Sequence, residues 1–142
     1  MDQIRRNIPK LGKKLTNPPI IQFFDKSSLL HLLSTTDLYV HSADAEIEAI
    51  SCIEAFSCGI IPIIANSPKS ATPQFALDER SLFEAGNPTN LAQKIDYWIE
   101  HEKDRKQLEI QYSNLGETYR IDKCMEKMER MFEDAIRERR KV

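Results

Sequence analysis

Two glutamates, Glu46 and Glu54, are the residues of this chain whose type and spacing best suit ligand-binding chemistry. They stand eight positions apart in a segment that reads EIEAISCIEAFSCG over residues 46–59. We expect a helix over about 48–58, which would separate the two carboxylates by about 12 Å along the helix axis. Carboxylates at the two ends of such a span can accept hydrogen bonds from the hydroxyl groups of a nucleotide diphosphate sugar.

The elements around this segment place it at one edge of a sheet. A strand-like run over 37–41 (DLYVH) precedes it, and a second run over 60–65 (IIPIIA) follows it. A strand, a loop, a helix and another strand predict a βαβ unit with parallel strands. In such units the helix N-terminus at the carboxyl end of a strand suits phosphate groups, because the free amides and the helix dipole both favour negative charge.

The E-x7-E pattern on a strand, a loop and a helix resembles the retaining glycosyltransferases of the GT-B fold, which use nucleotide sugars. The longer run over 38–84, with ISCIEA and IANSPKSATPQFALDERSLF, is similar to the bacterial lipid glucosyltransferases, the cholesterol α-glucosyltransferases among them. The resemblance implies that residues 1–142 are part of a C-terminal domain that binds a nucleotide sugar, with UDP-glucose as the donor and a lipid or glycan as the acceptor. It also implies that the acceptor-binding domain and the first two strands of the donor domain lie outside this chain.

The resemblance implies roles only at matched positions. Glu46 would contact hydroxyl groups of the donor sugar and is the candidate catalytic residue, and Glu54 would hold the ribose. The backbone amides expected near the sugar and the diphosphate are those of Ile47, Glu48, Ala49 and Ile50. Many relatives carry a glycine-rich loop after the first glutamate, so the Ile-Glu-Ala sequence here makes close approach of the sugar to the backbone less assured.

For the parent enzymes the resemblance implies front-face transfer with retention, in which the leaving diphosphate helps to take the acceptor proton. Glu46 would orient the sugar and would not be a covalent nucleophile. No metal or other cofactor is expected, because helix amides and basic side chains would carry the phosphate charge. Without the acceptor-binding domain the isolated chain is expected to be inactive. The alternative is a non-catalytic nucleotide-binding or interaction half that functions only with a partner chain.

Each candidate also has an ordinary explanation. Glu46 and Glu48 are residues that a helix N-terminus favours in solvent, and Glu54 is a good helix former. His41 ends a strand at the edge where the site is expected, so it either contacts a ligand or serves in capping and packing.

Basic residues are scarce near the expected site. Lys69, in the NSPKS loop, is the only one we expect there, and nothing in the sequence shows that it replaces the basic residues of the missing loops. Arg80 is expected to be a turn residue that pairs with Asp78 or Glu79.

Composition narrows the function class. The chain has 142 residues, 41% of them hydrophobic and 30% charged, and a net charge of −2, which gives no reason to expect nucleic acid as a partner. No apolar run is long enough to span a bilayer and no signal peptide begins the chain, so we expect a cytoplasmic location. Peripheral membrane contact through the basic end at 137–141 stays open. Of three cysteines, Cys52 and Cys58 are expected to be small buried thiols and Cys124 is unpaired by any C-x-x-C pattern.

The remaining pattern alternates strands and helices before turning helical. It predicts a short basic helix over 3–15, a strand over 20–24 and a helix over 27–34 that is capped by Ser27. A short helix over 73–77, a charged turn over 78–80 and a strand over 81–84 follow the motif segment and its second strand. Three long helices complete the pattern, over 90–101, 104–119 and 122–140. The predicted fold class is α/β: a Rossmann-like parallel sheet flanked by helices, truncated at its N-terminal side, with a helical C-terminal third.

Three details of this pattern can be tested directly. Trp98 is expected in the core, and Gly116 is expected to break a helix. In the family's strand order, a gap two strands wide would separate the strand over 20–24 from 37–41, so something must compensate for the missing strands. Either 20–24 moves beside 37–41 or another copy of the chain covers the exposed edge, and we favour a homo-oligomer.

Overall fold

Three short parallel strands form the centre of the computed structural model, which describes residues 7–8, 12 and 15–139. They are β1 (Leu38–His41), β2 (Ile61–Asn66) and β3 (Leu82–Glu84), in the order β1-β2-β3. Leu38 is in register with Ile61, and Ile64 with Leu82. The first five residues of β2 are buried, because helices cover both faces of a central parallel strand. The predicted α/β fold class is confirmed.

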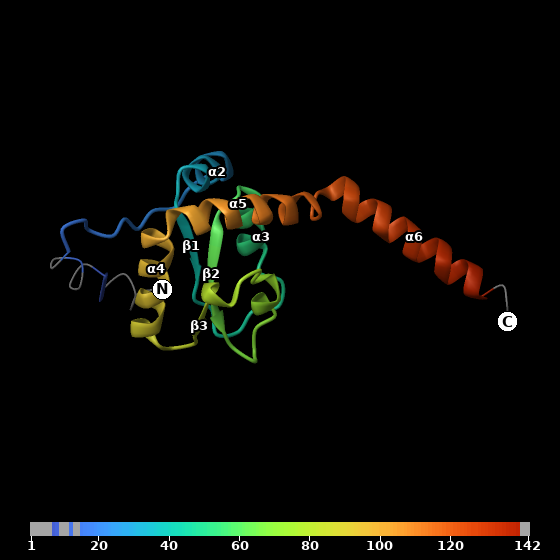
Figure 1. The fold of residues 1–142 in the computed structure, drawn as a ribbon. Coiled ribbons are helices and arrows are strands. Elements are labelled where there is room, and N and C mark those ends of the chain that lie inside the picture. The colour runs from blue at the N-terminus through green and yellow to red at the C-terminus, as the bar shows by residue number, and fades with distance from the viewer. Residues whose placement is uncertain (1–6, 9–11, 13–14, 140–142) are drawn as a thin grey trace.

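Helices surround this sheet (Figure 1). They are α2 (Lys26–Ser34), α3 (Ile50–Ser57), α4 (Pro88–Glu100) and α5 (Glu102–Glu117), with short 3-10 turns at Thr72–Phe75 and Glu79–Ser81. A further helix, α6 (Ile121–Arg139), follows α5. Helix α3 packs on β1, β2 and α5, and α4 packs on β3, β2 and α5. Asn87 caps α4, since its side chain accepts a hydrogen bond from the Asn90 amide at 2.9 Å.

Large aromatic side chains fill the core between the sheet and the helices. Trp98, Tyr112 and Phe56 are all fully buried, which confirms the prediction for Trp98. The Tyr112 hydroxyl accepts a hydrogen bond from the Leu77 amide at 3.0 Å, so this buried polar atom is satisfied.

Helix α5 fixes the amino end of the sheet. Arg105, which is 8% exposed, pairs with Asp37 just before β1 at 2.5 Å. Helix α5 therefore lies near the start of β1, away from the loop that leaves the end of this strand. Gly116 does not break the helix, contrary to the prediction. A Cβ atom on Gly116 would lie 2.6 Å from the Cα of Ser57, so this glycine lets α5 approach the backbone of α3.

The prediction of a strand over 20–24 is wrong. These residues have no regular secondary structure, and Ile20 is 84% exposed. A strand is stabilised by hydrogen bonds to a neighbour, and within residues 15–139 only β2 pairs with β1. The cap of α2 also differs from the prediction, because the Asp25 carboxylate accepts from both the amide and the hydroxyl of Ser28. Most of the predicted helix over 3–15 lies outside the described residues.

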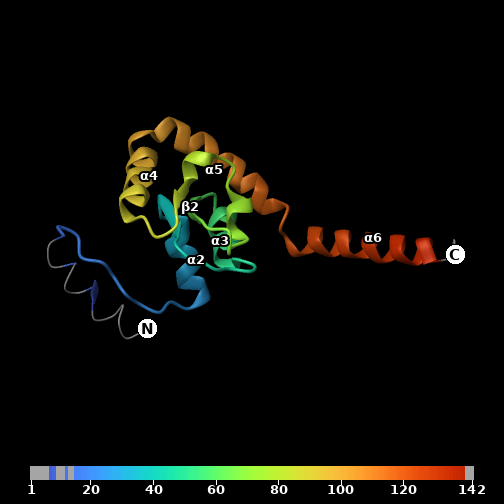
Figure 2. The ribbon, with the colours of Figure 1, turned by 90° about the horizontal axis from the view of Figure 1, so that it is seen from below.

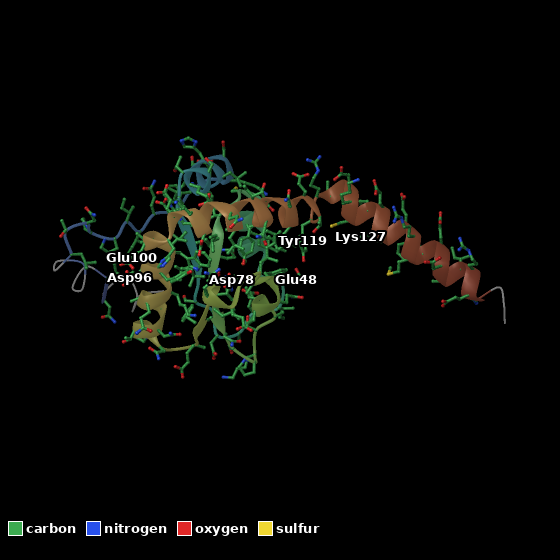
Figure 3. All side chains as sticks on the ribbon, viewed as in Figure 1. Glu48, Asp78, Asp96, Glu100, Tyr119 and Lys127 are labelled. Atoms are coloured by element: carbon green, nitrogen blue, oxygen red, sulfur yellow. The ribbon has the colours of Figure 1, made fainter. Side chains whose placement is uncertain are left out.

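The last helix projects away from the rest of the molecule in both ribbon views (Figures 1 and 2). No described residue of α6 is buried, although its apolar stripe includes Met128, Phe132 and Ile136. Figure 3 labels Lys127 on this helix, and Glu48 on the part of the molecule that contains the sheet. Among the described helices, none is both long and apolar enough to cross a bilayer.

Candidate functional site

The motif segment leaves the carboxyl end of β1 as a loop, residues 42–49, which we call the motif loop. Helix α3 then begins at Ile50, two residues later than predicted. The reason is Ala49, the N-cap residue, which has φ 48° and ψ 48° in the left-handed region. An alanine pays a steric penalty there that glycine does not. Glu46 therefore lies in the loop rather than in the first helical turn, and only Glu54 lies on α3.

Five of the residues expected to face the donor lie around one hollow, and Glu54 and His41 are not among those that line it. This open hollow, which we call the donor hollow, is lined by Glu46, Ile47, Glu48, Ala49 and Ile50. It lies where β1 ends and α3 begins, at the edge of the sheet that the sequence predicted. Ile47 is 86% exposed and Ile50 is 61% exposed, whereas Ala49 is buried beneath them.

Glu46 is ionised at neutral pH. Its carboxylate accepts a hydrogen bond from the Ile47 amide at 2.9 Å. Hydrogen bonds from the backbone of Ile47 and Ala49 hold the pKa of Glu46 below its usual range. An ionised carboxylate only accepts hydrogen bonds, which suits the hydroxyl groups of a sugar. In these bonds, amides of the motif loop converge on the negatively charged carboxylate of Glu46.

Glu54 lies on the side of α3 that faces α2. Its side chain is 30% exposed, and its Oε1 atom lies 3.6 Å from the Lys26 ammonium at the start of α2. The position is thus partly buried and close to a positive charge, rather than fully solvated.

The motif loop is joined to the loop after β2, residues 67–71. Asp44 accepts a hydrogen bond from the Ser67 hydroxyl at 2.8 Å and one from the Lys69 ammonium at 3.2 Å. These two groups hold the pKa of Asp44 below its usual range. Lys69 is therefore paired with Asp44 at this edge. Sequence reasoning missed Asp44 and Ser67, although both are polar residues that follow the ends of parallel strands.

His41 is almost completely buried, with 6% of the residue exposed. Its Nδ1 lies 3.3 Å from the Tyr39 hydroxyl, which in turn donates to the Ser51 hydroxyl at 2.9 Å. This chain of contacts joins the end of β1 to the first turn of α3. The packing role considered for His41 is therefore present, and its contact with a ligand stays a prediction.

The other reactive side chains lie outside the donor hollow. Burial raises the pKa of the Cys52 thiol to about 12, which makes it a poor nucleophile. Cys58 is exposed, contrary to the prediction, because it is the C-cap residue of α3 and lies beyond the buried face of that helix. Arg80 binds Asp78 at 2.5 Å, as predicted, and also Asp104 of α5 at 3.1 Å. In the part of the chain that the structure describes, no three His, Cys, Asp or Glu residues cluster in a way that could hold a metal ion.

The parallel sheet and the helices packed on it define an α/β, Rossmann-like domain, and the comparisons identify its family. The chain belongs to the family described as glycosyl transferases group 1, whose sequence model matches residues 6–114. It is similar to the crystal structure of the catalytic domain of cholesterol-alpha-glucosyltransferase from Helicobacter pylori. The identity is 46%, the match covers 82% of this chain and 74% of the other, and the TM-score is 0.76. A search of curated proteins found no significant match.

These findings confirm the resemblance inferred from the E-x7-E pattern and from the run over 38–84. They leave the roles of individual residues as predictions.

Proposed function

We propose that this chain is a donor-binding portion of a retaining glycosyltransferase, which binds UDP-glucose for transfer to a lipid or glycan acceptor. The observation that carries the proposal is that Glu46 and the four residues after it line one hollow at the N-terminus of α3. The similarity to a cholesterol glucosyltransferase supports glucose as the sugar and a lipid as the acceptor. Residues 1–142 would form a partial C-terminal, nucleotide-sugar-binding domain.

The proposed ligand spans the motif from one glutamate to the other. The Glu46 carboxylate accepts hydrogen bonds from sugar hydroxyls in place of the one that it accepts from the Ile47 amide. This amide, with those of Glu48, Ala49 and Ile50, then faces the sugar and the diphosphate. The diphosphate then lies at the N-terminus of α3, where the helix dipole favours negative charge. Glu54 accepts hydrogen bonds from the ribose, and Lys26 beside it favours the anionic nucleotide.

In the complete enzyme, transfer would break the bond between the anomeric carbon and the diphosphate oxygen. The acceptor oxygen forms a new bond on the same face of the sugar, and its proton passes to the leaving diphosphate. Glu46 orients the sugar in this scheme and forms no bond to it. This orientation lowers the barrier because the reacting atoms are held in place before the reaction.

Calorimetric titration with UDP, UDP-glucose and GDP-glucose tests the proposal. We expect Glu54→Ala to weaken binding of UDP by about 1–3 kcal/mol, because it removes a charged hydrogen-bond acceptor. Glu46→Ala should weaken binding of UDP-glucose more than that of UDP. Glu129→Ala, on the exposed face of α6, is the matched control and should bind as the unmodified chain does. Equal affinity of all four proteins for UDP-glucose would refute the assignment.

The alternative, a non-catalytic half that works with a partner chain, draws support from α6. This helix exposes an apolar stripe and has no buried residue among those described. A chain that fails to bind any of the nucleotides while binding a partner protein would favour this alternative.

A further inference from the structure

Two loops at the carboxyl edge of the sheet are held together by side chains that no sequence pattern connects. Asp44 comes from the motif loop, and Ser67 and Lys69 come from the loop after β2. Both carboxylate oxygens of Asp44 are used: Oδ1 accepts from the Ser67 hydroxyl at 2.8 Å and Oδ2 from the Lys69 ammonium at 3.2 Å. We call these three residues the loop clasp.

The loop clasp has a rigid side. Ser67 follows β2 directly and is 3% exposed. Its hydroxyl oxygen also accepts a hydrogen bond from the Lys69 amide at 3.2 Å, so the turn that carries Lys69 is held by the same atom. Asp44, by contrast, is exposed. Exposed ion pairs contribute little to the free energy of unfolding. We therefore expect the loop clasp to influence the position of the motif loop more than the stability of the fold.

The clasp acts on Glu46 from nearby. Asp44 stands two residues before Glu46, and the Glu46 carbonyl accepts a hydrogen bond from the Ala71 amide at 2.9 Å. Glu46 also pairs with Ser70 in a single parallel bridge. Two kinds of contact therefore hold the backbone at Glu46 against the loop after β2. One is the backbone hydrogen bond at Glu46 itself, and the other is the side chain of Asp44.

We propose that Asp44 is a positioning residue for Glu46, and that the loop clasp thereby makes the site select a sugar-bearing nucleotide over the free nucleotide. This inference rests on the proposed function. Hydrogen bonds to a pyranose need the carboxylate placed within about 0.5 Å of its best position. Free UDP makes no use of the Glu46 carboxylate. It contacts the motif loop only through the backbone amides that face its diphosphate, and otherwise depends on α3 and Glu54, so the clasp affects its binding less than that of UDP-glucose.

The test compares the ratio of the affinities for UDP-glucose and UDP in a set of variants, measured by calorimetry. Asp44→Ala should lower this ratio by about two- to fivefold, the range expected when an exposed polar tie is lost, with a smaller effect on UDP affinity than on UDP-glucose affinity. Asp44→Asn should restore most of the ratio, because its amide oxygen can still accept from Ser67. Lys69→Met, which leaves the Asp44–Ser67 bond in place, should have an intermediate effect.

Asp96→Ala, on the exposed face of α4, is the matched control, and thermal unfolding of every variant shows that it is folded. An unchanged ratio in a folded Asp44→Ala variant would overturn the inference alone. So would a parallel loss of affinity for both ligands. If the unmodified chain binds neither nucleotide, the proposed function fails and the inference fails with it.

Discussion

The left-handed conformation of Ala49 allows a quantitative test of the structure at the donor hollow. Among the described residues, Ala49 is the one non-glycine residue with positive φ. That conformation costs an alanine about 1–2 kcal/mol, which glycine does not pay. Substitution to glycine also removes a buried methyl, worth about 0.8 kcal/mol, and adds unfolded-state entropy worth about 0.4–1 kcal/mol. These effects nearly cancel, so Ala49→Gly should change the free energy of unfolding by no more than about 1 kcal/mol.

Ala55 provides the matched comparison. It lies within α3, six positions after Ala49, and its side chain is fully buried. Ala55→Gly loses the same methyl and also about 1 kcal/mol of helix propensity, so it should destabilise the fold by about 2 kcal/mol. The two variants should therefore differ by about 1–2 kcal/mol, with Ala49→Gly the more stable.

Urea unfolding followed by far-UV circular dichroism measures both variants under one set of conditions. The slope with urea should be the same in both, because neither substitution changes the surface exposed on unfolding by much. If Ala49→Gly loses as much stability as Ala55→Gly, the left-handed conformation at Ala49 and the late start of α3 are both wrong.

Gly116→Ala should destabilise the fold by about 1–3 kcal/mol in urea unfolding, because the new Cβ would lie 2.6 Å from the Ser57 backbone. The cost of this overlap outweighs the gain in helix propensity. A more stable variant would contradict the close packing of α5 on α3. A hydrogen bond from Arg80 holds the pKa of Asp78 below its usual range, so this carboxylate contributes stability above the unfolded pKa of about 3.9, which is lost as the pH falls through the lower folded value. Asp78→Asn should flatten the acid side of the stability profile, and an unchanged profile from about pH 2 to 5 would count against the pair. The purified chain should transfer no glucose to sterols or diacylglycerol, because catalysis needs donor and acceptor held together, and robust transfer would disprove this. Size-exclusion chromatography with light scattering should show self-association through the open edge of β1, whereas a clean monomer at high concentration would rule it out.

Local signals were sufficient for most of the sheet and for α4. The apolar run over 61–65 predicts a buried parallel strand, and β2 is buried along nearly its whole length. Asn87 followed by Pro88 predicts a helix start, and Asn87 caps α4. These predictions succeeded because each depends on residues close together in the chain.

The errors arose where a neighbour in space decides the outcome. An apolar run such as 20–24 has the composition of a strand, but it forms none here because no described strand pairs with it. Alanine is the best helix former, so nothing in the sequence indicates that Ala49 takes a left-handed conformation and delays α3. Glycine disfavours helix, yet Gly116 lies within α5, where it allows close contact with α3.

The sequence by itself determined the family, the parallel βαβ unit and the two glutamates on which the proposed function depends. It could do so because hydrophobic periodicity and a motif of fixed spacing are properties of a continuous stretch of chain. Only the tertiary structure decided how these residues are held. Asp44 meets Ser67 and Lys69 across 23 and 25 positions, and such contacts form only when two loops are brought to the same edge of a sheet.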